Sequence, residues 1–93
     1  MVKVKLNLLN IFALKTKETS IEYEGETVKE IISKFIKDYR NKLDENLLDK
    51  KKKKLHPDIL ILHNGKDVRY KKNYKTKLKD GDQLYLSFPI SGG

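Results

Sequence analysis

The sequence predicts an α+β fold in which a mixed sheet of about four to five strands packs on one main helix. Three patterns support this: apolar and polar residues alternate near both ends of the chain, apolar residues recur at helical spacing in one segment, and residues 59–62 are an unbroken apolar run. With 93 residues, the chain is the size of a single domain. We therefore expect residues 1–93 to form one unit.

The first strand is predicted at residues 2–9, where apolar and polar residues alternate. The apolar residues that would share one face of it are Val2, Val4, Leu6 and Leu8. A second, shorter strand is predicted at residues 20–24, after a polar turn at 15–19. We expect these two strands to pair as a hairpin.

The main helix is predicted from residue 27 onward, because apolar residues then recur every three or four positions. This stripe consists of Val28, Ile31, Ile32, Phe35, Ile36, Tyr39 and Leu43. Thr27 and Glu30 form the pattern of a capping box, in which the threonine hydroxyl accepts from the Glu30 amide and the Glu30 carboxylate accepts from the Thr27 amide. The helix should therefore begin at Thr27.

A basic loop is predicted at about residues 44–57, where no period is sustained. It contains the run Lys50 to Lys54, and residues 47–93 hold twelve Lys and Arg against five Asp and Glu. This excess of positive charge fits either an anionic partner or a solvated lysine-rich surface. We favour the solvated surface, because exposed aromatic residues that would stack nucleic-acid bases are not interleaved with the lysines.

The remaining strands follow the basic loop. We expect residues 59–62 to form a strand buried on both faces, Asn64 and Gly65 to form a two-residue hairpin turn, and residues 66–70 to form the return strand. After a turn at residues 80–82, a last strand is predicted at 83–88. With the first and last strands adjacent behind the helix, this order of elements gives a β-grasp, or ubiquitin-like, fold.

The residues that the sequence lacks argue against several kinds of chemistry. The chain has no cysteine, and neither His56 nor His63 has a second ligand at metal spacing in the sequence, so we expect no metal site and no catalytic residues of its own. Its apolar stretches are far shorter than the roughly 20 residues that span a bilayer. We therefore expect a cytoplasmic protein with no membrane partner.

The most unusual feature is the pair Gly92 and Gly93. Pro89 should end the last strand, so residues 90–93 are expected to form a flexible tail. Two residues without a Cβ can enter a narrow channel and leave the terminal carbonyl open to attack. A frayed end with no function is the alternative.

Together, these motifs resemble the MoaD/ThiS family of ubiquitin-like sulfur carriers, and its MoaD branch most. The segments that carry the resemblance are Ile61 to Tyr70, Thr76 to Asp82 and Phe88 to Gly93. The chain departs from the branch in having one proline, Pro89, after Phe88, and in the run Lys50 to Lys54.

The resemblance implies a carrier rather than an enzyme. Gly93 would be adenylated and then converted to a thiocarboxylate, and Gly92, Ser91 and Ile90 would form the tail. Phe88 and Pro89 would dock to a partner. The alternative is that Phe88 is a core residue and Pro89 only ends the strand. No cofactor would bind this chain, since ATP and Mg²⁺ would belong to a ubiquitin-activating-like adenylating enzyme.

The final acceptor stays open at this point. The resemblance to the MoaD branch favours sulfur transfer to the large catalytic subunit of a molybdopterin synthase. Archaeal ubiquitin-like modifier relatives are instead joined to lysines of target proteins through the same terminus. A β-grasp domain that binds nucleic acid through its basic half is a third and weaker hypothesis.

Overall fold

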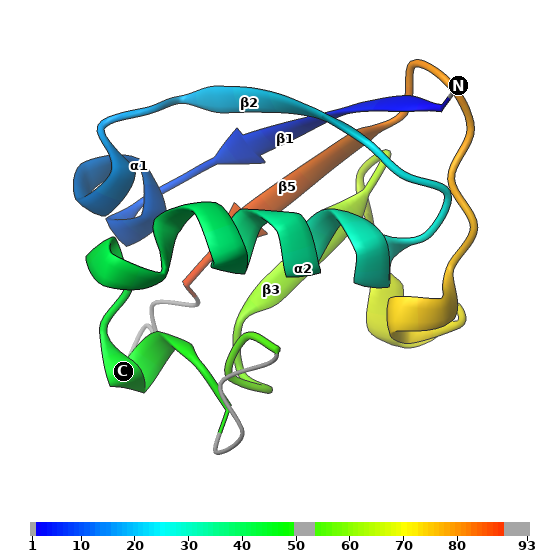
Figure 1. Cartoon of the computed structure of the whole chain (residues 1–93). Helices are drawn as coiled ribbons and strands as arrows, with labels where there is room; N and C mark the ends of the chain where they lie inside the picture. The colour runs from blue at the N-terminus through cyan, green and yellow to red at the C-terminus, as the bar shows by residue number, and fades with distance from the viewer. Residues whose placement is uncertain (1, 50–53, 89–93) are drawn as a thin grey trace.

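The computed structural model describes residues 2–49 and 54–88. A five-stranded mixed sheet lies behind one long helix, α2 (Figure 1). The strands are β1 (Lys3–Leu8), β2 (Ser20–Glu24), β3 (Leu60–His63), β4 (Lys66–Asp67) and β5 (Gln83–Ser87). The helices are α1 (Ile11–Thr16), α2 (Val28–Tyr39) and the 3-10 turns η1 (Arg40–Lys42), η2 (Glu45–Leu47), η3 (Val68–Tyr70) and η4 (Asn73–Lys75).

The sheet has the predicted topology. Its strand order is β2-β1-β5-β3-β4, and the first and last strands lie side by side and parallel, with Leu6 opposite Leu84. β1 also pairs antiparallel with β2, as expected of the two N-terminal strands. The β-grasp prediction is therefore confirmed.

The core lies between the sheet and α2. Alternate residues of β1 and β5, including Leu6, Leu84 and Leu86, face the helix and are fully buried. From α2, the ring of Phe35 meets Phe12 edge to face at 6.2 Å between centroids, and it also contacts Tyr39 at 5.4 Å. The contact with Phe12 packs α2 against α1.

The start of α2 is as predicted, but its capping differs in one detail. The Thr27 hydroxyl accepts from the Glu30 amide at 3.3 Å, which confirms the N-cap. The Glu30 carboxylate accepts from the amide of Glu26, not that of Thr27. Thr27 lies opposite Lys77 in an isolated β-bridge, in which the Val28 amide donates to the Thr76 carbonyl and the Leu78 amide to the Glu26 carbonyl.

The structure contains one helix that the sequence analysis did not predict, and it differs from two local predictions. Helix α1 forms ahead of the expected turn, because burial of Phe12 draws this segment onto the core. Strand β3 alternates between buried and half-buried residues, because α2 covers only one face of the sheet. Strand β4 has two residues instead of five, because the Asp67 side chain accepts from the Arg69 amide and starts η3.

The predicted basic loop takes part in the core more than its composition indicates. Leu47 and Leu48 are buried, and Leu48 forms an isolated bridge with Leu55, which is also buried. Lysines 50–53 lie outside the described residues, so their surface role stays a prediction. Among the residues that the structure describes, no helix is long and apolar enough to cross a bilayer.

The hairpin between β3 and β4 turns at Asn64 and Gly65, which both have positive φ, at 50° and 90°. An added Cβ at Gly65 would meet no atom within 4 Å, so any cost of substitution comes from backbone strain alone. We expect Gly65→Val to lower the free energy of unfolding by about 1–2 kcal/mol. Gly65→Asn, which tolerates positive φ, should cost less. Denaturant unfolding of both variants measures this, and equal stability of the Val variant and the wild type would contradict it.

A network of side-chain hydrogen bonds joins this hairpin to the residue before β5. His63 is buried, and its Nε2 lies 2.7 Å from the Asp82 carboxylate while its Nδ1 lies 2.7 Å from Lys71 Nζ. Because an ammonium only donates, Nδ1 is the acceptor and Nε2 carries the proton. The Asp82 carboxylate also accepts from the Lys79 amide at 2.8 Å and from the Asn64 side chain at 3.1 Å.

This network should be visible in the acid stability of the protein. Burial raises the pKa of Asp82, but hydrogen bonds from His63, the Lys79 amide and Asn64 outweigh burial and leave the pKa below its ordinary value. The contribution of ionised Asp82 to the free energy of unfolding is thus fully present above the unfolded pKa of about 3.9. It is lost as pH falls through the lower pKa of the folded state. We expect the stability difference between wild type and Asp82→Asn to be about 1–3 kcal/mol at pH 7 and to shrink below pH ~4.

The control for Asp82 is Asp58→Asn, since the Asp58 side chain is 78% exposed and its 3.8 Å pairing with His56 is at the surface, where such pairs add little stability. That variant should match the wild type at every pH. Denaturant unfolding measured between pH 2.5 and 7 gives both curves. A difference for Asp82→Asn that is constant with pH would contradict the assignment.

Candidate functional site at the end of the last strand

The candidate site is the end of β5, from which the predicted tail continues. β5 lies between β1 and β3, and its residues Leu84 and Leu86 are fully buried. Beyond the last ladder pair, the Leu9 amide donates to the Leu86 carbonyl at 3.0 Å. The end of β5 is therefore held in place by its two neighbouring strands and by the buried side chains.

Asn10 extends this order to the last described residue. Its side-chain amide donates to Ser87 Oγ and to the Phe88 carbonyl, each at 3.0 Å. Its backbone adopts φ 53° and ψ −129°, a region that residues with a Cβ rarely occupy. Backbone strain at Asn10 thus accompanies the two hydrogen bonds that hold the chain immediately before Pro89.

Phe88 is the one predicted site residue within the described chain. It follows β5 rather than belonging to it, and its side chain is 36% exposed, whereas the core residues of β5 are fully buried. It lines a shallow pocket of about 310 Å³ together with Asn10, Ile11, Asp44, Asn46 and Leu47. A half-exposed aromatic ring at a pocket edge fits contact with a partner better than a core role.

Two other elements help to build this region. α1 lies at the same end of the molecule as the end of β1, and β1 ends beside the end of β5 because the two are parallel (Figure 1). Lys15 of α1 forms an exposed ion pair with Asp44 at 3.2 Å, linking α1 to the segment before η2. Leu9 and Leu14 add exposed apolar surface nearby in the chain.

The other predicted site residues, Pro89, Ile90, Ser91, Gly92 and Gly93, lie outside the described residues, so their roles stay predictions. Within residues 2–49 and 54–88, no three His, Cys, Asp or Glu residues gather as a metal site. Sequence reasoning missed Asn10 altogether. An Asn before a short apolar segment is a weak signal, and its partner Phe88 is 78 positions away.

If the terminus is modified, as the family resemblance implies, Asn10 should affect that reaction more than it affects stability. Asn10→Gly removes two hydrogen bonds but also relieves the backbone strain, so we expect little change in the free energy of unfolding. If the two hydrogen bonds contribute about 1 kcal/mol to holding the chain in the reactive position, their loss should lower kcat/KM for modification of the terminus roughly fivefold. Asn10→Ala loses the same bonds and keeps the strain, so it should be less stable than Asn10→Gly. Equal kcat/KM for wild type and Asn10→Gly would show that Asn10 does not position the chain.

The fold and this strand end define the chain as a ubiquitin-like protein of the β-grasp class. A sequence model of the ThiS family matches residues 8–93. The chain therefore belongs to the ThiS family, within the ubiquitin-like sulfur carriers and modifiers. The search of curated proteins gives no match.

Solved structures agree with this assignment. The small archaeal modifier protein 1 of Methanosarcina acetivorans is 26% identical, with a TM-score of 0.85 over 100% of this chain and 98% of that one. A chain of the Amycolatopsis orientalis BexX/CysO complex is 30% identical, with a TM-score of 0.73 over 97% and 99%. A Pyrococcus furiosus protein named as a candidate molybdopterin converting factor, subunit 1, is 25% identical, with a TM-score of 0.71 over 97% and 100%.

Proposed function

We propose that this protein is a sulfur carrier whose Gly93 is adenylated and converted to a thiocarboxylate. The observation that carries the proposal is the ThiS-family match, which extends through Gly92 and Gly93. The geometry supports it, because β5 and Asn10 hold the chain in place as far as Phe88. A tail that begins at a fixed point can enter a partner's channel with less loss of entropy than one that begins in a loose segment.

A free carboxylate is a poor acyl donor and must be activated first. The Gly93 carboxylate would attack the α-phosphorus of ATP, forming an acyl adenylate and releasing pyrophosphate. The terminal sulfur of a protein persulfide would then attack the Gly93 carbonyl and release AMP, giving an acyl disulfide. A second thiol would attack that disulfide, leaving the thiocarboxylate on Gly93 and a disulfide on the sulfur donor.

In this scheme the chain is a carrier and its partners hold the catalytic groups. A ubiquitin-activating-like adenylating enzyme would bind ATP and Mg²⁺. Phe88 and Pro89 would dock to it, and Ile90 and Ser91 would connect them to Gly92 and Gly93. The exposure of Phe88 supports this part of the proposal. Because the first step consumes ATP, we assign the reaction to the cytoplasm.

For the acceptor, we propose the large catalytic subunit of a molybdopterin synthase, with the sulfur passed to a pterin precursor. The similarity to the Pyrococcus furiosus protein supports this choice. The second candidate function is conjugation of Gly93 to lysines of target proteins. The similarity to the Methanosarcina acetivorans modifier protein supports that alternative.

The intact mass of the protein purified from its source tests both. A thiocarboxylate replaces oxygen by sulfur and adds about 16 Da. Protein conjugation gives instead a ladder of higher-mass species with Gly93 joined to lysine. An unmodified terminus after incubation with ATP, Mg²⁺, the adenylating enzyme and a persulfide donor would overturn the carrier function.

A further inference from the structure

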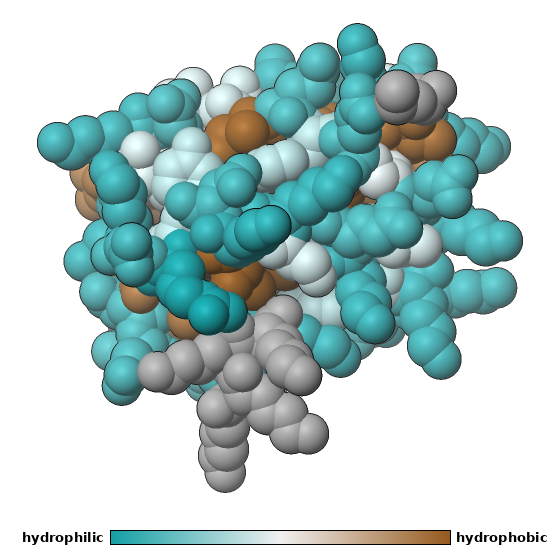
Figure 2. All heavy atoms as spheres, viewed as in Figure 1, coloured by the Kyte–Doolittle hydropathy of each residue, from teal (hydrophilic) through white to brown (hydrophobic). Residues whose placement is uncertain are grey.

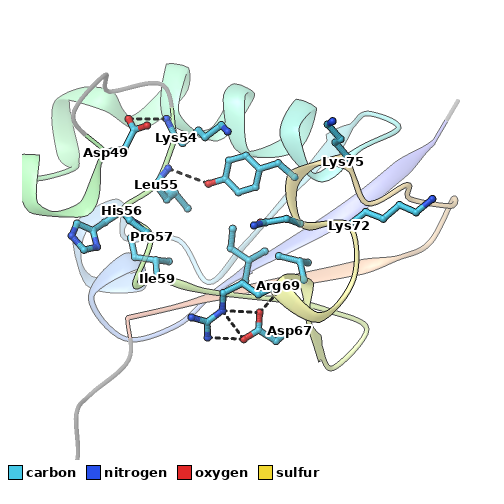
Figure 3. A pocket seen from close by; sticks show the side chains of 14 residues that line it. Asp49, Lys54, Leu55, His56, Pro57, Ile59, Asp67, Arg69, Lys72 and Lys75 are labelled. Atoms are coloured by element: carbon cyan, nitrogen blue, oxygen red, sulfur yellow. Dashed lines mark hydrogen bonds and ion pairs between the residues drawn. The ribbon is translucent and has the colours of Figure 1, made fainter.

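A basic groove runs between α2 and the segments on either side of β3 and β4. It consists of two pockets that share Lys54 and Tyr74, and its basic side chains include Lys29, Lys37, Lys54, Lys72 and Lys75. The first pocket has a volume of about 420 Å³ and is lined by more residues than the second. In Figure 3, residues 54–59 border that pocket on one side and the segment with Lys72 and Lys75 on the other.

The groove carries an unbalanced positive charge. Within the described residues, the ammonium groups of Lys29, Lys37, Lys72 and Lys75 form no ion pair with a carboxylate. Two carboxylates also line the groove, and both are engaged: Asp67 holds Arg69 at 2.7 Å, and Asp49 accepts from the Lys54 amide at 3.3 Å. Exposed like charges gathered at one site attract an anion and are relieved by it.

The floor of the first pocket is apolar, which favours an anion that also carries an apolar group. It is formed by the side chains of Leu55, Ile59, Ile61 and Val68. Figure 2 shows hydrophilic side chains over most of the face that includes α2, with small apolar areas between them. An occupant that matches both features carries acidic groups and an apolar side chain together.

Nucleic acid matches this lining less well. Binding of single strands relies on aromatic rings that are free to stack with bases. Tyr74 is the aromatic residue of the groove lining, and its ring is covered by the Lys54 ammonium, 5.0 Å from the ring centroid. Tyr70 is 89% exposed but does not line either pocket. The Tyr74 hydroxyl accepts from the Leu55 amide at 3.2 Å, which ties the ring to the groove wall.

We propose that the basic groove binds an acidic peptide segment of a protein partner. A leucine or phenylalanine of that segment would occupy the apolar floor of the first pocket. Flanking aspartates and glutamates would contact Lys54, Lys72 and Lys75, and further acidic residues would follow α2 toward Lys29 and Lys37. Ile59 of the floor precedes Leu60, which pairs with Ser87, so this end of the groove lies near the end of β5. The proposed binding does not depend on the chemistry of Gly93.

The test is a titration of the ¹⁵N-labelled full chain with the synthetic peptide Glu-Asp-Glu-Leu-Phe-Asp-Glu-Glu. The amide signals of Leu55, Val68 and Tyr74 should shift during the titration. A triple variant, Lys54→Gln with Lys72→Gln and Lys75→Gln, should bind on the order of tenfold more weakly. A peptide with Ser in place of Leu and Phe should lose affinity to a similar extent, since the apolar floor would be left empty.

The matched control changes three exposed lysines outside the groove, Lys3→Gln with Lys5→Gln and Lys66→Gln. It carries the same change in net charge and should bind the peptide as the wild type does. Equal weakening by both triple variants, or shifts confined to residues outside the groove, would overturn the proposal. Tighter binding of a uridine oligonucleotide than of the peptide, lost in the groove variant, would overturn it in favour of nucleic acid.

Discussion

Deletion of Gly92 and Gly93 should abolish ATP-dependent adenylation of the chain while leaving its free energy of unfolding unchanged. The described core is formed by residues up to Leu86, and glycine has no side chain to bury, so we expect the deletion to leave the core intact. The deletion would leave the carboxylate on Ser91, two residues short of its place in the adenylating site. Misplacing a reacting atom costs at least ~10²-fold in rate. Release of pyrophosphate with purified adenylating enzyme measures the effect.

The control is Ser91→Ala, which keeps the length of the tail and its terminal glycines. It should be adenylated at close to the wild-type rate. Full adenylation of the chain that lacks Gly92 and Gly93 would contradict the proposed carrier function. Loss of adenylation together with a lower melting temperature would show that the tail supports the fold, which is not what we expect.

Phe35→Ala should produce the largest loss of stability. Phe35 is fully buried on α2 and contacts the rings of Phe12 and Tyr39. Its replacement by alanine leaves a cavity between the helix and α1, at a cost of about 3–5 kcal/mol. Domains of this size are stable by only about 5–15 kcal/mol, so we expect a substantial unfolded fraction near the physiological temperature. Denaturant unfolding gives the difference.

Two variants control for this substitution. Phe35→Leu fills most of the cavity and should cost less than the alanine variant. Tyr70→Ala removes an aromatic ring that is 89% exposed and should leave stability nearly unchanged. A cost for Phe35→Ala no larger than that for Tyr70→Ala would contradict the core described above.

Sequence patterns predicted those parts of the fold that depend on local chemistry. The 3.6-residue period and Thr27 predicted α2 and its first turn, and alternation predicted β1 and β5. The turn at Asn64 and Gly65 was also predictable, because few residue pairs tolerate positive φ. In each case the signal and the structure lie within a few residues of each other.

The missed features depend on partners far along the chain. The His63 network requires Asp82, 19 positions later, and the short β4 results from a side-chain hydrogen bond that competes with the strand. The burial of Leu47, Leu48 and Leu55 was hidden by the lysines between them in the sequence. For the candidate site, the sequence singled out Phe88, whose docking role stays a prediction, but not Asn10, which donates to its carbonyl.

The parallel pairing of β1 with β5 also sets the order of events at the ribosome. β1 is made first, yet its neighbour on one side begins at Gln83, so the centre of the sheet stays open until nearly all of the described chain has been synthesised. Contacts between such distant segments form late and slowly. A nascent or truncated chain that lacks β5 has no anchored strand end. If Gly93 is modified as proposed, the reaction would favour chains in which β5 has already paired with β1.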